Sequence, residues 1–367
     1  MIDLPIYLDH AATTFPDEIV IGAVSACMRA QPCNASAAYS AAGDARRIHR
    51  LARRRIGSML ACPPEQLYFT SGGTEANNWV IRAFSNMHVV LSAIEHHSIL
   101  EPARACGCRI SYASPDASGY VAPESIEAAL MPDTKLVCLQ AANNETGVIQ
   151  PIREVYALCK ARRIHLHVDA VQAFGHIPLD ARYCDSMSLS AHKLYGPRGA
   201  GALYIRSVAS IAPFLLGGGQ ESGMRAGTEN TPAICGFDVA ASLAAEDMHL
   251  RSERERKFLG DFIRQIQSAI PEISVLGESR ERLPGVCAIL LPRLSSEAVI
   301  AAMDLKGIMI SGGAACASHS GKPSHVYTAM GLSAEDAGRV IRISIGRHTT
   351  AEQLSYAADT LIAIMQR

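Results

Sequence analysis

The stretch SMSLSAHKLYGP, residues 186–197, is the part of this chain that decides its fold and its chemistry. Its first residues, 186–190, are typical of a short buried strand, and Gly196-Pro197 marks a turn. Lys193 lies between the two, next to a hydroxyl and an imidazole. A lysine amine at the end of a buried strand is well placed to form a Schiff base with an aldehyde.

A second expected strand ends in a carboxylate upstream of this lysine. The sequence His167-Val168-Asp169-Ala170-Val171-Gln172 is typical of a buried strand that stops at Asp169. A lysine for the aldehyde and a carboxylate for the ring nitrogen are two groups that pyridoxal phosphate (PLP) needs from a protein. Lys193 and Asp169 together therefore predict a PLP site.

Short apolar runs alternate with amphipathic stretches through the first two thirds of the chain. This alternation predicts an α/β fold with a mainly parallel sheet that is covered on both faces. The expected strands are residues 67–70, 89–92, 109–113, 135–140, 164–168, 186–190 and 201–205. The expected helices of this region are residues 18–29, 44–60, 74–84, 123–130 and 152–163.

The pattern changes after about residue 232. A long helical stretch runs to about residue 269, and a smaller α+β region follows it. Its expected strands are 274–276, 285–291 and 340–344, and its expected helices are 296–306 and 351–366. We expect a large PLP-binding domain over residues 16–250. Residues 1–15 plus 251–367 are expected to form a small domain that carries the loop around Cys316.

Composition and charge give no sign of a nucleic-acid or membrane partner. The 367 residues carry a formal net charge of −1, with 49% hydrophobic and 19% charged residues, as in an ordinary globular protein. The arginines of the helix expected at 44–60 are interpreted as a solvated face, because no aromatic residues interleave with them. No apolar run is long enough to span a membrane, and the N-terminus lacks the pattern of a signal peptide.

The eleven cysteines are scattered, and most lie inside apolar runs. A cysteine there behaves as a small buried hydrophobe, and without an export signal the pattern favours free thiols in a reducing cytoplasm. Cys106 and Cys108 form the one tight pair, and no second pair follows at the spacing of zinc ligands. His165 and His167 alternate along one strand, which we interpret as packing. No metal is expected.

Cys316 differs from the other ten cysteines in its surroundings. It lies among the small residues Gly312-Gly313-Ala314-Ala315 and Ala317-Ser318. An uncrowded thiol in a loop can approach a bound substrate, whereas a packed thiol cannot. The alternative is a buried loop cysteine without a chemical role.

Two segments offer groups for a phosphate and a ring. The turn Ser71-Gly72-Gly73-Thr74 precedes an expected helix, and free N–H groups at a helix N-terminus bind phosphate. His96 follows the expected strand 89–92, where an imidazole could stack on a ring and transfer protons. The alternative for His96 is a surface or helix-capping histidine.

Two further residues could bind a substrate carboxylate. Asn144 follows the expected strand 135–140, and open α/β sheets bind ligands at the carboxyl ends of their strands. Arg342 is a charge inside the apolar run Ile341-Arg342-Ile343, and its planar fork suits a carboxylate. The alternative for Arg342 is an arginine at a surface edge.

The ordered set of these segments resembles the cysteine desulfurases of the class V PLP-dependent aminotransferase-like proteins. Among these, the likeness is to the group with the longer catalytic-cysteine loop, and it covers nearly the whole chain. The matching stretches are residues 7–14, 71–78, 95–96, 143–147, 167–172, 191–197, 223–228, the Cys316 loop and 341–347.

This resemblance implies fold type I of the PLP-dependent transferases. Such a fold has a large, mainly parallel seven-stranded sheet domain and a smaller α+β C-terminal domain, and the enzymes work as homodimers. By matching position, Lys193 would bind the cofactor aldehyde and Asp169 would pair with the ring nitrogen. Gln172 would contact the phenolic oxygen, and His96 would stack on the ring.

The resemblance also implies groups for the phosphate, for the substrate and for catalysis. Cys316 would be the nucleophile. The substrate carboxylate would be bound by Asn144 and Arg342. The phosphate would be bound by Gly73, Thr74, Ser190, His192 and, from the partner subunit, Thr228.

The implied activity removes sulfur from L-cysteine, releases L-alanine and leaves a persulfide on Cys316. The sulfur would pass to an acceptor protein, an iron–sulfur scaffold or a thiolation enzyme, in the cytoplasm. One alternative is a PLP-dependent aminotransferase, or a cysteine or selenocysteine lyase, that does not use Cys316. A second alternative is a non-catalytic regulatory paralogue.

The chain departs from the family pattern in three places. Members commonly carry Asn-Pro-x-Ser-x-His near the start, whereas this chain has Ala35 for the proline and Tyr39 for the histidine. This change could alter access to the active site or substrate preference. His319 and Lys322 stand where other members often have small or acidic residues. The chain stops at Arg367, without the longer tail that docks the iron–sulfur scaffold, so that acceptor is less expected.

Overall fold

The computed structural model describes residues 4–30, 33–313 and 323–366. A seven-stranded sheet with the order β2-β8-β7-β6-β5-β3-β4 is its largest element. All neighbouring strands are parallel except the two pairs made by β8, so the mainly parallel seven-stranded sheet is confirmed. Its strands are β2 (Leu67–Thr70), β3 (His88–Ser92), β4 (Arg109–Ala113), β5 (Thr134–Gln140), β6 (His165–Asp169), β7 (Ser186–Ser190) and β8 (Gly201–Ile205).

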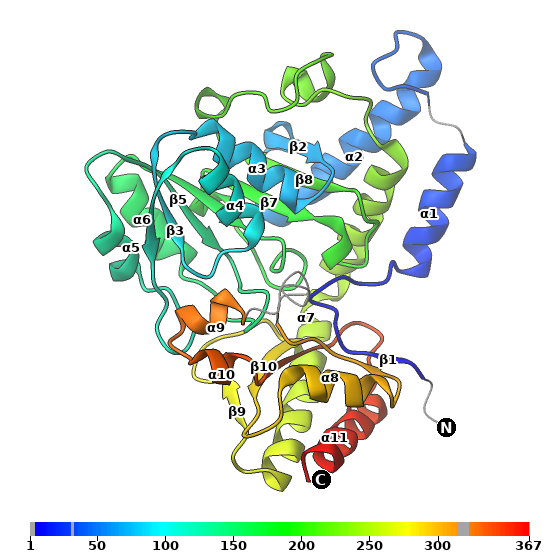
Figure 1. Ribbon diagram of the computed structural model, residues 1–367. Helices are drawn as coiled ribbons and strands as arrows, with labels where there is room; N and C mark the ends of the chain where they lie inside the picture. Colours follow the sequence, from blue (N-terminus) through cyan, green and yellow to red (C-terminus); the bar gives the residue numbers. More distant parts are fainter. Residues whose placement is uncertain (1–3, 31–32, 314–322, 367) are drawn as a thin grey trace.

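Helices cover both faces of this sheet (Figure 1). Successive residues of a strand point to opposite faces, so both sets of side chains must be apolar. In β3, Val89 and Leu91 pack with α3 and α4, whereas Val90 packs in the cluster that contains α2, α6 and α7. The covering helices are α2 (Gly43–Leu60), α3 (Gly73–Ala83), α4 (His97–Ala105), α5 (Pro123–Ala129), α6 (Ile152–Ala161) and the first half of α7 (Thr231–Ala269).

The carboxyl ends of the parallel strands meet at one edge of the sheet. Gln140 ends β5, Asp169 ends β6 and Ser190 ends β7, and all three are buried. Because the chain turns into loops and helices at this edge, it is where an open α/β sheet binds ligands.

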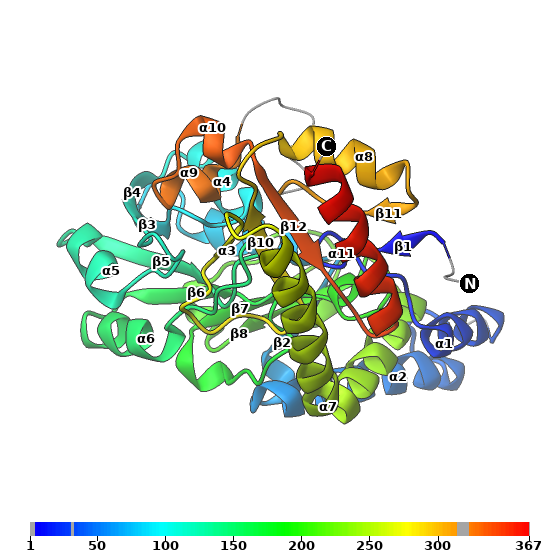
Figure 2. The same ribbon diagram turned by 90° about the horizontal axis from the view of Figure 1, so that it is seen from below.

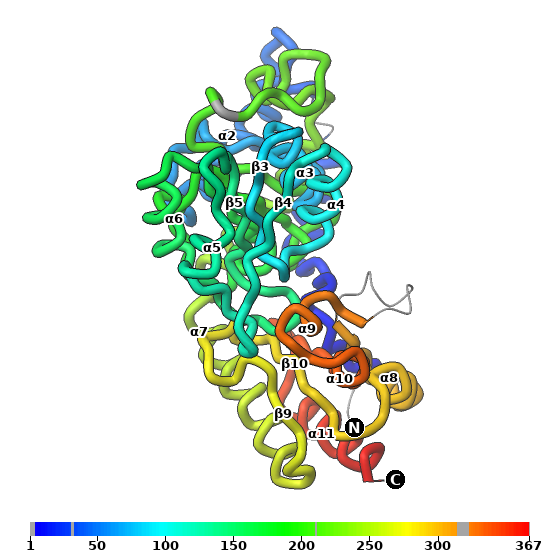
Figure 3. Tube along the Cα trace, turned by 60° about the vertical axis from the view of Figure 1, so that its left-hand side comes forward, coloured from blue at the N-terminus to red at the C-terminus, as the bar shows by residue number. Residues whose placement is uncertain are grey.

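A smaller α+β unit lies below the sheet (Figure 1). Its antiparallel sheet has the order β12-β10-β9, and β1 pairs with β11 beside it. Figure 3 shows the two units one above the other, with both ends of the chain at the smaller unit. Its elements are β1 (Ile6–Tyr7), β9 (Ser274–Leu276), β10 (Val286–Leu290), α8 (Ser296–Asp304), β11 (Ile308–Met309), α9 (His325–Ala329), α10 (Ala334–Ala337), β12 (Val340–Ser344) and α11 (Ala351–Met365).

The 39-residue helix α7 belongs to both units. Its first half packs against α1 (Glu18–Arg29) and α2, and its second half packs against α11 (Figure 2). Apolar residues such as Phe237 lie in the core of the large sheet, and Phe262 lies in the core of the smaller unit. A single rigid element therefore connects the two cores.

Five of these helices and strands were not expected from the sequence. Two of them, α9 and α10, have five and four residues, too few to show a helical period. The strands β1 and β11 have two residues each, too few for any periodic pattern. Helix α4 has nine residues and contains Pro102, which weakens the helical signal. The pairing of β1 with β11 brings the N-terminal segment to the smaller unit, and this segment then continues past the end of the large sheet.

A buried histidine between α2 and α7 makes the large unit sensitive to acid. His49 is 4% exposed, and its Nε2 forms a 2.9 Å hydrogen bond with Oγ1 of Thr231. Burial, with a smaller contribution from the positive Arg53, lowers the pKa of His49 from 6.5 to about 4. The folded protein keeps this ring neutral, whereas the unfolded chain binds a proton below its unfolded pKa of 6.5. Stability is therefore lost as the pH falls from the unfolded toward the folded pKa.

From pH 6.5 to pH 5, this histidine is expected to remove about 2 kcal/mol from the free energy of unfolding. The His49→Gln variant keeps an amide that can reach Thr231 but does not titrate. Between the two pH values its free energy of unfolding should therefore fall by about 2 kcal/mol less than that of the wild type. Urea unfolding at the two pH values measures the difference. His249→Gln is the control, because the side chain of His249 is 86% exposed. Equal pH dependence of His49→Gln and the wild type would contradict the prediction.

Among the described residues, no helix is long and apolar enough to cross a membrane. In the same part of the chain, no three His, Cys, Asp or Glu side chains are grouped to hold a metal ion.

Candidate active site

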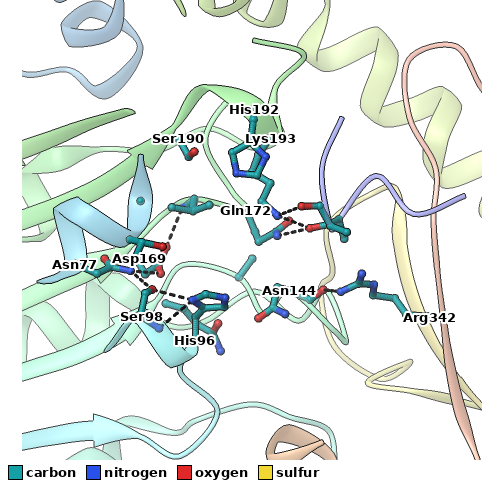
Figure 4. A pocket seen from close by; sticks show the side chains of 17 residues that line it. Asn77, His96, Ser98, Asn144, Asp169, Gln172, Ser190, His192, Lys193 and Arg342 are labelled. Atoms are coloured by element: carbon teal, nitrogen blue, oxygen red, sulfur yellow. Dashed lines mark hydrogen bonds between the residues drawn. The ribbon is translucent and has the colours of Figure 1, made fainter. Parts of the chain in front are cut away.

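One pocket at the carboxyl edge of the large sheet brings together most of the residues named from the sequence (Figure 4). Cys316 lies outside the described residues. Thr228 is exposed and lines a separate pocket with Ser71 and Arg225. The named residues that line the pocket at the sheet edge are Gly73, Thr74, His96, Asn144, Asp169, Gln172, Ser190, His192, Lys193 and Arg342.

The amine of Lys193 reaches the pocket from the turn that follows β7. Its Nζ donates hydrogen bonds to the carbonyl oxygens of Ala11 at 2.5 Å and Ala12 at 2.7 Å. Gln172 donates from Nε2 to the same oxygen of Ala11 at 2.8 Å. The N-terminal segment thus fixes the direction of both side chains after it leaves β1.

Asp169 ends β6 and is 7% exposed. Its Oδ1 accepts a hydrogen bond from the backbone N–H of Val171 at 3.0 Å, and its Oδ2 accepts one from Nδ2 of Asn77 at 2.7 Å. Both donors fix the plane of the carboxylate at the wall of the pocket. A carboxylate held in this way can accept a hydrogen bond from a protonated ring nitrogen.

His96 both caps a helix and lines the pocket. Its Nδ1 accepts a hydrogen bond from the backbone N–H of Ser98 at 3.1 Å, at the start of α4. The helix-capping alternative therefore describes one part of its role. Burial lowers the pKa of His96, and the positive Lys193 adds to this effect, although the negative Asp169 opposes it. The ring is therefore neutral near pH 7.

The N-terminus of α3 forms one side of the pocket. Gly72, which precedes the helix, leaves its first N–H groups without a side-chain cap, so they are available to an anion. Ser190 and His192 also line the pocket, and the ring of His192 contacts Oγ1 of Thr13 at 3.1 Å. Burial, with a smaller contribution from Lys193, lowers the pKa of His192 to about 4, so its ring is neutral.

Gly73 lets α3 begin close to the loop that follows β6. A Cβ atom at this position would lie 2.4 Å from Cγ2 of Val171, so a larger residue forces the two segments apart. This close approach keeps the N–H groups of α3 at the pocket. Only glycine fits at this position without displacing Val171.

These residues fit PLP. The pocket has an amine for the aldehyde, a carboxylate held by two N–H donors, an imidazole for the face of the ring, and an uncapped helix N-terminus for the phosphate. Lys193, Asp169, His96 and the Gly73–Thr74 turn would hold these four parts of the cofactor.

Arg342 is 1% exposed, so the alternative of a surface-edge arginine is wrong. Its Nη1 donates to the carbonyl oxygen of Asn144 at 2.9 Å, and its Nη2 donates to Oδ1 of Asp9 at 2.6 Å. Its buried Nε has no hydrogen-bond partner among the described residues. The guanidinium is therefore held firmly and keeps donors for an anionic ligand.

The chain on either side of residues 314–322 is anchored beside these groups. Ser311 pairs with Arg342 through two backbone hydrogen bonds, and Oγ of Ser324 donates to Oε2 of Glu145 at 2.7 Å. Glu145 is fully buried, and it follows Asn144 in the chain. Both described ends of the segment that contains Cys316 thus lie next to the groups expected to bind the substrate carboxylate.

Sequence reasoning missed several residues of the pocket. The carbonyl groups of Ala11 and Ala12 have no signal in the sequence, because every residue carries a carbonyl. Asn77 and Ser98 had a signal, since a polar residue inside an apolar helical pattern often has a buried partner. The missed residues are Ala11, Ala12, Asn77, Ser98, Gln140, Ala142 and Val171.

Comparison with known proteins places this chain in a family. The family model of the class-V aminotransferases matches residues 6–356. The chain belongs to this family. Within it, the chain is 38% identical to cysteine desulfurase IscS of Clostridium botulinum over 375 residues, which cover 99% of this chain and 94% of that protein. The resemblance to the cysteine desulfurases is confirmed, and PLP is the cofactor of this class-V protein.

Solved structures have the same fold. A NifS-like protein from Rickettsia africae is 31% identical, with a TM-score of 0.91, and the likeness covers 100% of both chains. The protein SspA, solved in complex with cysteine, is 31% identical with a TM-score of 0.81, and the likeness covers 94% of this chain and 100% of that one. These likenesses confirm the expected PLP-dependent transferase fold of this class-V protein.

Enlarging Gly73 is expected to weaken PLP binding. In Gly73→Ala the new methyl group overlaps Val171, and overpacking of about 1–3 kcal/mol corresponds to about 5- to 150-fold weaker binding. Titration of the apoprotein with PLP measures the change. Adding Val171→Ala removes the clashing methyl group and should restore most of the affinity. Gly22→Ala is the control, because nothing lies within 4 Å of its Cβ position, and unchanged binding by Gly73→Ala would contradict the prediction.

Proposed function

We propose that this class-V protein is a cysteine desulfurase that transfers the sulfur of L-cysteine to Cys316. The bond between Cβ and sulfur breaks, an S–S bond forms with the thiolate, and the net products are L-alanine and a persulfide. The arrangement around the pocket carries this proposal. A lysine amine and a buried arginine line one cavity, and the described ends of the Cys316 segment contact Arg342 and Glu145 beside it.

The substrate is proposed to enter with its carboxylate toward Arg342 and Asn144. Arg342 already gives one hydrogen to Asn144 and one to Asp9, so its position is fixed before substrate arrives. A fixed guanidinium loses little entropy when it binds a carboxylate, and the pair is charge-assisted. This contact would orient the amino group toward Lys193 and the side chain toward the Cys316 segment.

Lys193 is proposed to move the proton of the substrate Cα. PLP, when bound, supplies an electron sink for the pair left behind by that proton. Asp169 would keep the ring nitrogen protonated, because its carboxylate is fixed by Val171 and Asn77. Cys316 would then attack the substrate sulfur as a thiolate, since the thiolate is the nucleophilic form of cysteine.

We further propose that the enzyme is a homodimer. Thr228, assigned by resemblance to the phosphate site of the partner subunit, is exposed and lines a pocket other than that of Lys193. Large apolar side chains are also exposed on and before α1, where Phe15 is 58%, Ile19 61% and Met28 62% exposed. Exposed apolar side chains of this size support a protein contact.

The sulfur acceptor, the cellular compartment and the domain bounds are also proposed. The persulfide on Cys316 would pass to an acceptor protein, either an iron–sulfur scaffold or a thiolation enzyme. The cytoplasm is the proposed compartment, supported by the ten free cysteines in the described part of the chain. The proposed domains are residues 16–250 and residues 1–15 plus 251–367, supported by the packing of Ile6 and Leu8 in the core that contains Leu259.

The direct test supplies L-cysteine and measures L-alanine. The wild type should release L-alanine in a ratio of one to one with transferred sulfur when a thiol is present to accept the persulfide sulfur. A transaminase would convert L-cysteine into its 2-oxo acid and would release no alanine, and a regulatory paralogue would produce neither. Either of these outcomes would overturn the proposal.

A further inference from the structure

Asn77 connects the two residues that hold opposite sides of the proposed cofactor. It is 0% exposed and lies on α3. Figure 4 shows its amide directed at Asp169 and Ser98. Its Nδ2 donates one hydrogen to Oδ2 of Asp169 at 2.7 Å and the other to Oγ of Ser98 at 2.8 Å. Both hydrogens of the amide are therefore used, one toward Asp169 and one toward the residue that contacts His96.

The other side of Asn77 fixes which way this amide points. Its Oδ1 lies 3.0 Å from Nε2 of His167, and an amide oxygen can only accept. Nε2 of His167 must therefore carry a proton, and Nδ1 of this ring accepts from Oγ of Ser186 at 2.9 Å. His167, one of the two strand histidines expected to be packing residues, thus has a direction of hydrogen bonding that keeps the amide of Asn77 from turning over.

Ser98 connects Asn77 to His96 through hydrogen bonds. Its hydroxyl oxygen accepts from Asn77, so its proton is available to a different acceptor. Nδ1 of His96 lies 2.8 Å from this oxygen, and it also accepts from the backbone N–H of Ser98 at 3.1 Å. Two donors thus point at one ring nitrogen. A neutral imidazole that accepts at Nδ1 carries its proton on Nε2.

We propose that Asn77 and Ser98 are positioning residues that hold His96 as the tautomer with its proton on Nε2. This nitrogen, on the side of the ring away from Nδ1, then offers a hydrogen-bond donor toward the pocket and cannot act there as a base. The removal of the substrate proton is left to Lys193, and this part of the inference rests on the proposed function.

The charges around His96 agree with a neutral ring. Burial is the largest effect and lowers its pKa; Lys193, His97 and His325 lower it further, and only Asp169 raises it. Protonation at Nδ1 would break the contact with the backbone N–H of Ser98, which can only donate. The geometry and the charges therefore favour the same state of the ring.

The proposal is tested by nitrogen-15 NMR of the holoenzyme labelled at histidine. The signals of His96 are assigned from their absence in His96→Gln. At pH 7 the wild type should show a protonated Nε2 and an unprotonated Nδ1. A protonated Nδ1, in either the neutral ring or the imidazolium, would overturn the proposal. This readout needs no turnover, so it is independent of whether L-cysteine is the substrate.

The variant Ser98→Ala removes the hydroxyl donor and leaves Asp169 untouched. Loss of one hydrogen bond should shift the ratio of the two tautomers of His96 by about 2- to 10-fold toward Nδ1–H. Ser98→Thr restores a hydroxyl and should restore the ratio. The control is Asn78→Ala, whose amide donates within α3 to the carbonyl of Thr74 and should leave the ratio unchanged. A wild-type ratio in Ser98→Ala would overturn the role of Ser98.

Discussion

Lys193→Ala is expected to lower the rate of L-alanine release from L-cysteine by at least about 10⁴-fold, because a covalent anchor and a base are lost together. The variant should also lose the visible absorption that PLP has when it is bound to a lysine. Among the described residues that line the pocket, Lys193 is the one lysine, so none of them offers a substitute amine. Alanine release and absorption spectra of the purified variant measure both effects.

The control for this variant is Lys160→Ala. Lys160 is exposed on α6, and its amine lies 5.8 Å from the centre of the Tyr156 ring. Its replacement should change neither the spectrum nor the rate. An active Lys193→Ala enzyme with the normal absorption of bound PLP would show that another amine binds the cofactor, and the assignment of this pocket would then be wrong.

Cys316→Ala is expected to lower alanine release by at least about 10³-fold, as the loss of a nucleophile does in other enzymes. PLP binding should be unchanged, because Cys316 is assigned to the substrate and not to the cofactor. This combination separates the two variants, since Lys193→Ala loses both properties. Cys106→Ala is the control, because it removes a partly buried free thiol that has no assigned role.

The result for Cys316→Ala also separates the alternatives. A cysteine or selenocysteine lyase that does not use this thiol would keep its rate of alanine release in the variant. A regulatory paralogue would show no turnover in either the variant or the wild type. Only a desulfurase that uses Cys316 loses activity while its cofactor stays bound.

Most of the large sheet could be predicted from the sequence, for a physical reason. Its strands are buried on both faces, so each reads as a short apolar run, and the helices between them show a period of 3.6. The runs at β6 and β7 were recognised because each is bounded by polar residues at its carboxyl end. Strands β1 and β11 could not be found in this way, because two residues contain no period.

The pocket was predictable where a side chain carries unusual chemistry. Lys193 and Asp169 stand out in the sequence because a charged residue at the end of an apolar strand indicates a chemical role. Burial of Arg342 was one of two readings of its sequence context, and only the fold decides between them. The contacts of Lys193 with Ala11 and Ala12 are made by backbone carbonyls from a distant segment, and side-chain patterns contain no information about them.

The directions of the hydrogen bonds around Asn77 could not be predicted from the sequence. Asn77 could be recognised as part of a Gly-rich turn and helix, yet its partners lie on α4 and β6. The direction of each hydrogen bond follows only when the whole chain of donors and acceptors is known. Tautomers of histidine therefore belong to the tertiary structure, although the histidines themselves are visible in the sequence.

The central claim is that sulfur from L-cysteine becomes bonded to Cys316. Mass spectrometry of the peptide that contains Cys316, after the holoenzyme has been mixed with L-cysteine and thiols have been trapped, measures this directly. The account predicts one added sulfur atom on this peptide, formed in step with one L-alanine per site, and none in Lys193→Ala. Release of L-alanine by the wild type with no sulfur added at Cys316 would contradict it.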